Sequence, residues 1–388
     1  MESMNLFEKG SAAPKANLIH YQGELGDFWF DPMEFKVCQT STVPTEVEYL
    51  AREEKHDYLR YVGKGSQVGL PKGCISTRHM FRGSALPEGF KLVDFDTSNV
   101  INMEAMFCDC ILPKGFSLGD KFDTSNVINM DSMFAECSLK GNIFVGDKFD
   151  TSNVENMNHM FMNSDAAAVI IGDKFDTSKV TNMAYMFYGY NLPTGFTLGN
   201  KFDTSNVTNM EAMFCGCKMS VGFSLGDKFD TSNVTNMAYM FYDYNLSTGF
   251  TLGNKFDTSN VTNMEAMFCA CKMSVGFSLG DKFDTSNVRN MCSMFGGTEL
   301  PSGFTLGNKF DTSNVTNMEA MFCACKMSVG FSLGDKFSTS NVTNMRAMFY
   351  KCNLPEDFSL GHKFDTSKVT DMYRMFGECN LPGLFSWQ

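Results

Sequence analysis

The stretch "GDKFDTSNV" at residues 119–127 decides how this 388-residue chain folds. The same nine residues recur word for word at 146–154, 226–234 and 280–288. Close variants stand between these copies, and every copy is followed by a Met-Phe pair. Repetition on this scale indicates tandem structural repeats rather than a set of unrelated globular domains.

The Met-Phe pair sets the period of the repeat. It occurs twelve times, and successive copies are 27 residues apart except for two intervals of 26. Its phenylalanines are Phe81, Phe107, Phe134, Phe161, Phe187, Phe214, Phe241, Phe268, Phe295, Phe322, Phe349 and Phe376. So constant a period predicts a stacked array in which each repeat contacts only its neighbours.

Each repeat divides into two halves. In "NVTNMEAMF" (206–214) the apolar residues stand at i, i+3, i+6 and i+7, which predicts a short helix or 3₁₀ segment. In "GFTLGNKF" (195–202) they stand at even spacing, which predicts a short strand closed by glycines. We therefore expect an α/β solenoid of about 11–12 repeats, each with one short parallel strand and one short helix or 3₁₀ segment.

The unit "FDTSNVTNMEAMFCGC" (202–217) resembles the BspA-like leucine-rich-repeat family of bacterial proteins, whose units read close to FDTSNVTNMxxMFxxC. The likeness spans residues 73–388. For the fold it implies a leucine-rich-repeat-like, right-handed solenoid. For function it implies surface adhesion and protein binding, which many members carry out with export signals that are not visible here.

The chain divides into a non-repeat part, residues 1–66, and a repeat part, residues 67–388. The aromatic stretch "GDFWFDPMEF" (26–35) is suited to cover the first repeat, because the apolar ends of a repeat array must be covered. Thr45 and Glu48 stand at capping-box spacing, so a helix is expected within 45–62. A small recognition module is the alternative to a cap.

The formal net charge of −12 argues against direct binding to nucleic acid or to an anionic membrane surface. Neither a signal peptide nor an apolar stretch of membrane-spanning length is visible, and the many cysteines favour a reducing compartment. The sequence as it stands therefore predicts a cytoplasmic protein, with the cell surface as the location that the family resemblance implies.

The aspartate of "FDTSN" forms a column through the repeats, with Ser338 in the eleventh copy. Its members are Asp96, Asp123, Asp150, Asp176, Asp203, Asp230, Asp257, Asp284, Asp311 and Asp365. An aspartate here can accept a backbone N–H two residues on, and serine replaces it well in that role but badly as a metal ligand or catalytic acid. The pattern predicts a structural column; calcium binding or catalysis is the alternative.

Seven of the 14 cysteines also fall in one column, three residues after Met-Phe: Cys110, Cys137, Cys217, Cys271, Cys325, Cys352 and Cys379. No C-x-x-C pair exists, so buried reduced thiols are expected rather than zinc. The five histidines are dispersed, and no nucleotide-binding loop or catalytic constellation is present. No catalytic, cofactor or metal site is predicted, and we expect a non-enzyme.

The repeats differ mainly after Met-Phe. Residues 181–234 and 235–288 differ at three positions only, so a block of 54 residues is duplicated. It places Tyr185 and Tyr188 in one repeat and Tyr239 and Tyr242 two repeats later. Because exposed tyrosines often anchor interfaces, these four are candidate partner-binding residues. Packing between neighbouring repeats is the alternative.

The last Met-Phe is followed by only twelve residues. An uncovered final strand edge invites pairing, so Phe385 and Trp387 are candidate residues for self-association, giving a homodimer through this edge. The leading hypothesis is a non-enzymatic repeat scaffold that mediates protein recognition or adhesion. The alternative is an acidic, elongated decoy that occupies the nucleic-acid-binding groove of another protein.

Overall fold

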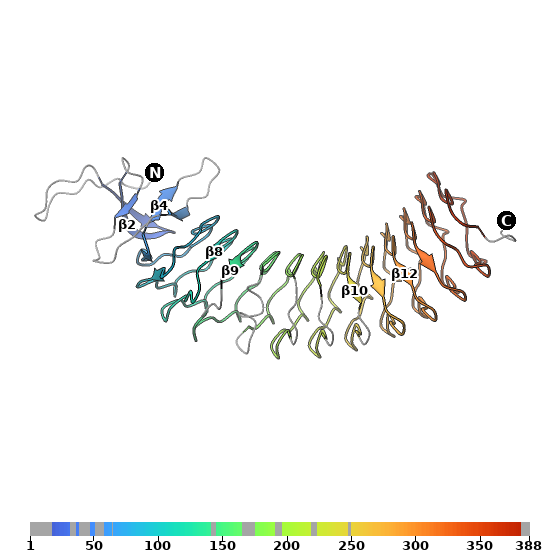
Figure 1. The fold of residues 1–388 in the computed structure, drawn as a ribbon, viewed down its shortest axis with the longest axis horizontal. Coiled ribbons are helices and arrows are strands. Elements are labelled where there is room, and N and C mark those ends of the chain that lie inside the picture. The colour runs from blue at the N-terminus through green and yellow to red at the C-terminus, as the bar shows by residue number, and fades with distance from the viewer. Residues whose placement is uncertain are drawn as a thin grey trace, which may run out of the picture. The chain divides into compact units, whose positions relative to one another are not determined.

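The structure is a computed structural model of the chain. It describes residues 18–31, 36–38, 47–50, 58–63, 65–140, 145–164, 175–190, 196–218, 223–246 and 250–381. The chain divides into two compact units, Met1–Lys179 and Val180–Gln388. Both units contain repeats (Figure 1). The described residues establish a repeat fold built on short parallel strands.

The non-repeat region of the first unit is built from antiparallel strands. They are β1 (Ile19–Gly23), β2 (Gly26–Asp31), β3 (Lys36–Cys38), β4 (Val47–Leu50) and β5 (Tyr58–Tyr61). The order β1-β2-β3 forms one sheet, and β4 pairs with β5 in a second.

The helix expected within 45–62 is wrong in the described part of that range, which contains β4 and β5 instead. Val47 pairs with Tyr61, and both side chains are buried. Valine and tyrosine favour a pleated, half-buried strand, so cross-strand packing prevails over the capping-box signal. The Tyr61 N–H donates to the Met80 carbonyl at 2.7 Å, and the Tyr61 ring lies 5.7 Å from that of Phe81. These contacts join β5 to the first repeat. The capping role of residues 1–66 stays a prediction.

The repeats pair through very short parallel strands. In the first unit these are β6 (Gln67–Val68) with β7 (Lys91–Leu92), and β8 (Ile111–Leu112) with β9 (Ser138–Leu139). The second unit has the sheet β10 (Asn245–Leu246), β11 (Lys272–Met273), β12 (Glu299–Leu300) and β13 (Lys326–Met327). A second ladder joins the asparagine before each repeat's first methionine, as Asn209 to Asn236 and Asn236 to Asn263.

The expected strand is present at the predicted place in the first repeat, where β7 corresponds to residues 197–198 and pairs with β6. In the other described repeats it is missing there. No strand is present in the described residues 196–202; β10 to β13 lie after Met-Phe instead. Phe196, Leu198 and Phe202 are buried as their spacing predicts. Rings of this type stack between repeats, as Phe277 and Phe304 do at 6.5 Å. Burial thus alternates along residues 196–202 and their described counterparts in the later repeats without strand pairing.

The expected helix or 3₁₀ segment is also wrong, because the described residues contain no helix. In residues 210–217, alternate N–H groups bond within the repeat and the others bond to the next repeat. Cys215 donates to the Ala212 carbonyl at 3.1 Å, whereas Ala212 itself donates across to Ala238 at 2.8 Å. A helix would keep these bonds inside the segment. The chain instead makes successive turns, with a positive φ of 50° at Ala212 and 66° at Gly216.

The apolar face that suggested a helix does form the core. Val207, Met210, Met213 and Phe214 are all completely buried. The Phe214 ring stacks on Phe187 at 5.5 Å and on Phe241 at 6.0 Å, with interplanar angles of 6° on both sides. The repeated apolar positions therefore stack repeat upon repeat, and surface differences between repeats arise at the residues around them.

Candidate functional site

The aspartate column has the structural role that the sequence predicts. Asp257 Oδ1 accepts the Ser259 N–H at 3.0 Å, and the other described copies repeat this bond. Ser338 accepts the Ser340 N–H through its hydroxyl at 3.4 Å. The hydrogen bonds from the Ser98 hydroxyl and N–H hold the pKa of Asp96 below its usual range. The turn that the sequence predicts at this column is therefore confirmed.

A threonine column that the sequence reasoning missed joins neighbouring repeats within each unit. The Thr258 hydroxyl donates to the Asp284 carbonyl at 2.7 Å and accepts the Asp284 N–H at 2.8 Å. Thr258 is completely buried, as are its counterparts in the other described repeats up to Thr339. Its invariance within "DTS" and "STS" was the available signal. The Thr258 hydroxyl thus bonds to both backbone groups of Asp284 in the next repeat.

The cysteine column is structural as well. Cys110 donates its thiol to the Phe81 carbonyl at 2.7 Å, and Cys271 donates to the Phe241 carbonyl at 2.9 Å. Thr298, in the same column, donates its hydroxyl to the Phe268 carbonyl at 2.6 Å. The described cysteines are free thiols, and burial raises the pKa of Cys110 to about 12. A buried, protonated thiol is a poor nucleophile and metal ligand.

The four tyrosines singled out from the sequence lie in two matching pairs. The rings of Tyr185 and Tyr188 are 5.9 Å apart, and those of Tyr239 and Tyr242 are also 5.9 Å apart. All four side chains are half-buried. Tyr185 is among the groups that raise the pKa of Tyr239, after the hydrogen bond that the Tyr239 hydroxyl donates to Glu265 and after burial. The duplicated block therefore places the two pairs on one side of the second unit.

Two glutamates that the sequence reasoning missed hold one ring of each pair. The Tyr185 hydroxyl donates to Glu211 Oε1 at 2.7 Å, and the Tyr239 hydroxyl donates to Glu265 Oε1 at 2.6 Å. The other oxygen of Glu211 accepts the Asn236 amide at 3.0 Å. Burial and the Glu211 carboxylate raise the pKa of Tyr185 to about 12. The alternation of "MAYMFY" with "MEAMFC" in the sequence could have indicated these bonds. In stacked repeats it places each tyrosine beside the glutamate of the next repeat.

We call these residues the Tyr–Glu face; they are Tyr185, Tyr188, Glu211, Tyr239, Tyr242 and Glu265. Small residues separate its two tyrosine pairs. Ala212, in the repeat between them, is buried to 1% exposure. All four tyrosine rings keep part of their surface exposed.

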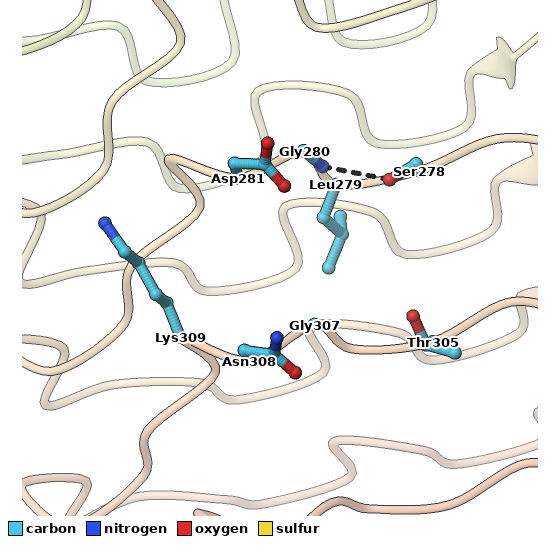
Figure 2. Close-up of a pocket in the computed structure, with 8 residues that line it drawn as sticks. All are labelled: Ser278, Leu279, Gly280, Asp281, Thr305, Gly307, Asn308 and Lys309. Carbon is cyan, nitrogen blue, oxygen red and sulfur yellow. Dashed lines mark hydrogen bonds between the residues drawn. The ribbon is translucent and has the colours of Figure 1, made fainter.

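Polar grooves lie between neighbouring repeats at the segments where the expected strand is missing. One, of about 380 Å³, is lined by Ser278 and Asp281 of one repeat and by Thr305 and Lys309 of the next (Figure 2). The Ser278 hydroxyl accepts the Gly280 N–H at 3.1 Å, which closes the turn at this edge. A second groove, of about 630 Å³, lies between residues 197–202 and 224–228. Both belong to the repeated pattern and carry no distinguishing group.

Within the described part of the chain, no group of three or more His, Cys, Asp or Glu side chains could hold a metal ion. His79 lies 3.5 Å from Glu104, and His159 lies 3.9 Å from Asp131, in separate repeats. No helix long and apolar enough to cross a membrane is found among the described residues.

The proposed self-association residues, Phe385 and Trp387, lie outside the described residues. The last described repeat exposes apolar side chains that are buried elsewhere in the array. Met372 is 43% exposed, whereas its counterpart Met345 is completely buried. Tyr373 and Leu381 are exposed beside it at 54% and 42%. Dimerisation through this end stays a prediction.

Comparison with known proteins gives one family. A model described as "Mycoplasma protein of unknown function, DUF285" matches residues 75–193, 163–276, 196–299, 247–328 and 274–382. No curated protein and no solved structure matches the chain. The overlapping matches run from the first repeat to the last and confirm the tandem repeats. The chain belongs to the DUF285 repeat family.

Proposed function

We propose that this chain is a non-enzymatic repeat scaffold that recognises another protein through the Tyr–Glu face. The finer description of the fold as a leucine-rich-repeat-like solenoid, and adhesion as the broader role, belong to the same proposal. One observation carries it: the duplicated block repeats a half-exposed tyrosine pair whose position a glutamate fixes. Half-exposed aromatic residues with restricted motion are the type of side chain that anchors protein interfaces.

The columns shared by all repeats support this choice of surface. Their aspartates, threonines and cysteines already bond to the chain itself. The Tyr–Glu face is one of the places where repeats depart from that common pattern. Recognition is therefore expected at these departures.

Charge pairing is the reason we prefer this proposal to the acidic decoy. Lys121 pairs with Asp94 at 2.6 Å, and Lys326 pairs with Glu299. A mimic of nucleic acid phosphates needs carboxylates without interleaved cations. No observation favours the decoy, which stays a prediction from the net charge.

Site-specific photocrosslinking tests the proposal. A photoreactive phenylalanine replaces Asp243, which is exposed beside Tyr242, and the labelled full chain is irradiated in extract of its native cell. The control places the same group at Thr251, an exposed position in the groove-lining half of the repeat. We expect a discrete protein adduct from position 243 alone, lost in the Tyr185→Ala/Tyr239→Ala variant. Equal labelling from both positions, or none from position 243, would contradict the proposal.

A further inference from the structure

The hydroxyl groups of the Tyr–Glu face fall into two classes. Those of Tyr185 and Tyr239 are bound to glutamates of the following repeats. Those of Tyr188 and Tyr242 have no hydrogen-bond partner among the described residues, and both rings are half-exposed. One tyrosine of each pair is thus fixed by the protein, and the other presents a donor to a ligand.

The spacing of these two donors is set by the repeat. Neighbouring parallel segments lie about 4.8 Å apart, so groups two repeats apart recur at about 9.6 Å. A polyproline II helix rises about 3.1 Å per residue with three residues per turn, which gives about 9.3 Å per turn. Its backbone carbonyls make no internal hydrogen bonds and stay available as acceptors. The pitch of the two tyrosine pairs therefore fits one turn of such a peptide.

The relief of the face fits the same ligand. Small residues stand between the two pairs at the positions that tyrosines occupy in the flanking repeats: Ala212 and Cys215 take the places of Tyr185 and Tyr188. In other proteins, proline-rich segments dock in grooves that are lined by aromatic side chains. The two tyrosine pairs, with small residues between them, form a surface of this kind. The glutamate bonds hold one ring of each pair in place, so little side-chain entropy is lost on binding.

The charge of the face selects the sequence of the peptide. Glu211 and Glu265 carry its negative charge, and the exposed Asp243 adjoins it. The turn segments 182–190, 209–217, 236–244 and 263–271 contain no lysine or arginine. Arginine or lysine in the ligand would meet carboxylates with no competing cation from these segments.

We propose that the Tyr–Glu face binds a basic, proline-rich segment of a partner protein in the polyproline II conformation. Tyr188 and Tyr242 donate to carbonyls one turn apart, prolines pack against the rings, and basic side chains reach Glu211 and Glu265. This inference rests on the proposed function and names the partner's chemistry.

The test uses the full chain and three labelled twelve-residue peptides, followed by fluorescence anisotropy. The probe is (Pro-Pro-Arg)₄; (Gly-Ser-Arg)₄ keeps its charge without the conformation, and (Pro-Pro-Glu)₄ keeps the conformation with the opposite charge. We expect saturable binding of the probe and at least about tenfold weaker binding of both controls. Equal binding of (Gly-Ser-Arg)₄ would reduce the effect to charge attraction and overturn the inference.

Matched variants locate the site. Tyr188→Ala/Tyr242→Ala is expected to weaken probe binding about tenfold or more, whereas Tyr350→Ala, in the same column of a repeat without a second tyrosine, leaves it unchanged. Should the alanine variant unfold, Tyr188→Phe/Tyr242→Phe removes only the hydroxyls and must still weaken binding. Unchanged affinity in a folded variant would overturn the assignment.

A last comparison separates this inference from the proposed function. Chitohexaose, an extended glycan, serves as a competing ligand of another class; its binding in place of the peptide would overturn the inference. Photocrosslinked protein at position 243 without binding of any peptide would leave the proposed function standing and this inference wrong. No adduct at position 243 contradicts the proposed function itself.

Discussion

At the scale of the residue, each shared column satisfies a hydrogen bond that the backbone alone leaves open. The turn at the aspartate could be predicted from sequence because Asp, Thr, Ser and Asn in succession bond locally, and Ser338 keeps the bond. The role of Thr258 could not be predicted, because its partner, Asp284, is 26 residues away and becomes a neighbour only when repeats stack. The same holds for Tyr185 and Glu211.

Replacing a buried column threonine should destabilise the protein without changing its shape. In Thr258→Val the hydroxyl is lost, so the Asp284 N–H and carbonyl lose their bonds at 2.8 and 2.7 Å. We expect about 1–3 kcal/mol less free energy of unfolding, measured by urea denaturation. Thr251→Val, at an exposed threonine, is the control with little effect. A similar cost for both variants would count against the column's role.

Ser338 offers the converse substitution. Ser338→Asp should restore the turn of the other repeats and raise the free energy of unfolding by less than about 1 kcal/mol at pH 7. The hydrogen bonds from Ser98 lower the pKa of Asp96 in the native repeat, and we expect the same direction for an aspartate at position 338. Such a gain is present above the unfolded-state pKa near 4 and is lost as the pH falls through the lower folded-state pKa. A gain that persists at pH 2 would contradict this cause.

At the scale of the element, burial was predictable and hydrogen bonding was not. Val207, Met210 and Phe214 are buried as a helix would bury them, yet the segment is a series of turns. Residues with positive φ, such as Ala212, and N–H groups directed to the next repeat replace the helical bonds. Apolar spacing reports which side faces the core, and the direction of the N–H groups depends on the neighbouring repeat.

The left-handed positions in these turns make a reciprocal pair of substitutions informative. Ala324 has a φ of 54°, and Gly297 occupies the same position one repeat earlier with a φ of 66°. Because a Cβ in this region costs about 1 kcal/mol, Ala324→Gly should stabilise and Gly297→Ala should destabilise by up to that amount. A Cβ at Gly297 would meet only ordinary contacts of 3.7 Å or more, so backbone strain alone is tested. The change in melting temperature of each variant, measured by thermal unfolding, tests this. A change in the same direction for both variants would contradict the expectation.

At the scale of the whole molecule, the twelve-fold pattern is visible in the sequence because repeats bury the same residue types at the same positions. The strands of residues 19–61 were not predicted, since this region has no internal period and its strands are specified by pairings such as Val47 with Tyr61. The family is of unknown function, so function must be argued from the surface where repeats differ.

Buried thiols make the molecule sensitive to alkali. Burial raises the pKa of Cys74 and Cys110 to about 12 and that of Cys215 to about 11, from 9.0 for a free thiol. The stability linked to these protons is fully present below pH 9 and is lost as the pH rises through 11 to 12. Urea midpoints should therefore fall steadily above pH 9. A midpoint unchanged between pH 8 and 11 would show that the thiols ionise freely in the folded state.

The central claim is that shared columns build the structure and that recognition lies in the Tyr–Glu face. Crosslinking yield from position 243, compared between Asp257→Ser and Tyr188→Ala/Tyr242→Ala in chains shown to be folded, tests it most directly. Asp257→Ser copies the substitution that Ser338 already represents, so its yield should match that of the unsubstituted chain, while the tyrosine variant should lose the adduct. Loss of the adduct in folded Asp257→Ser, with the tyrosine variant unaffected, would contradict the claim.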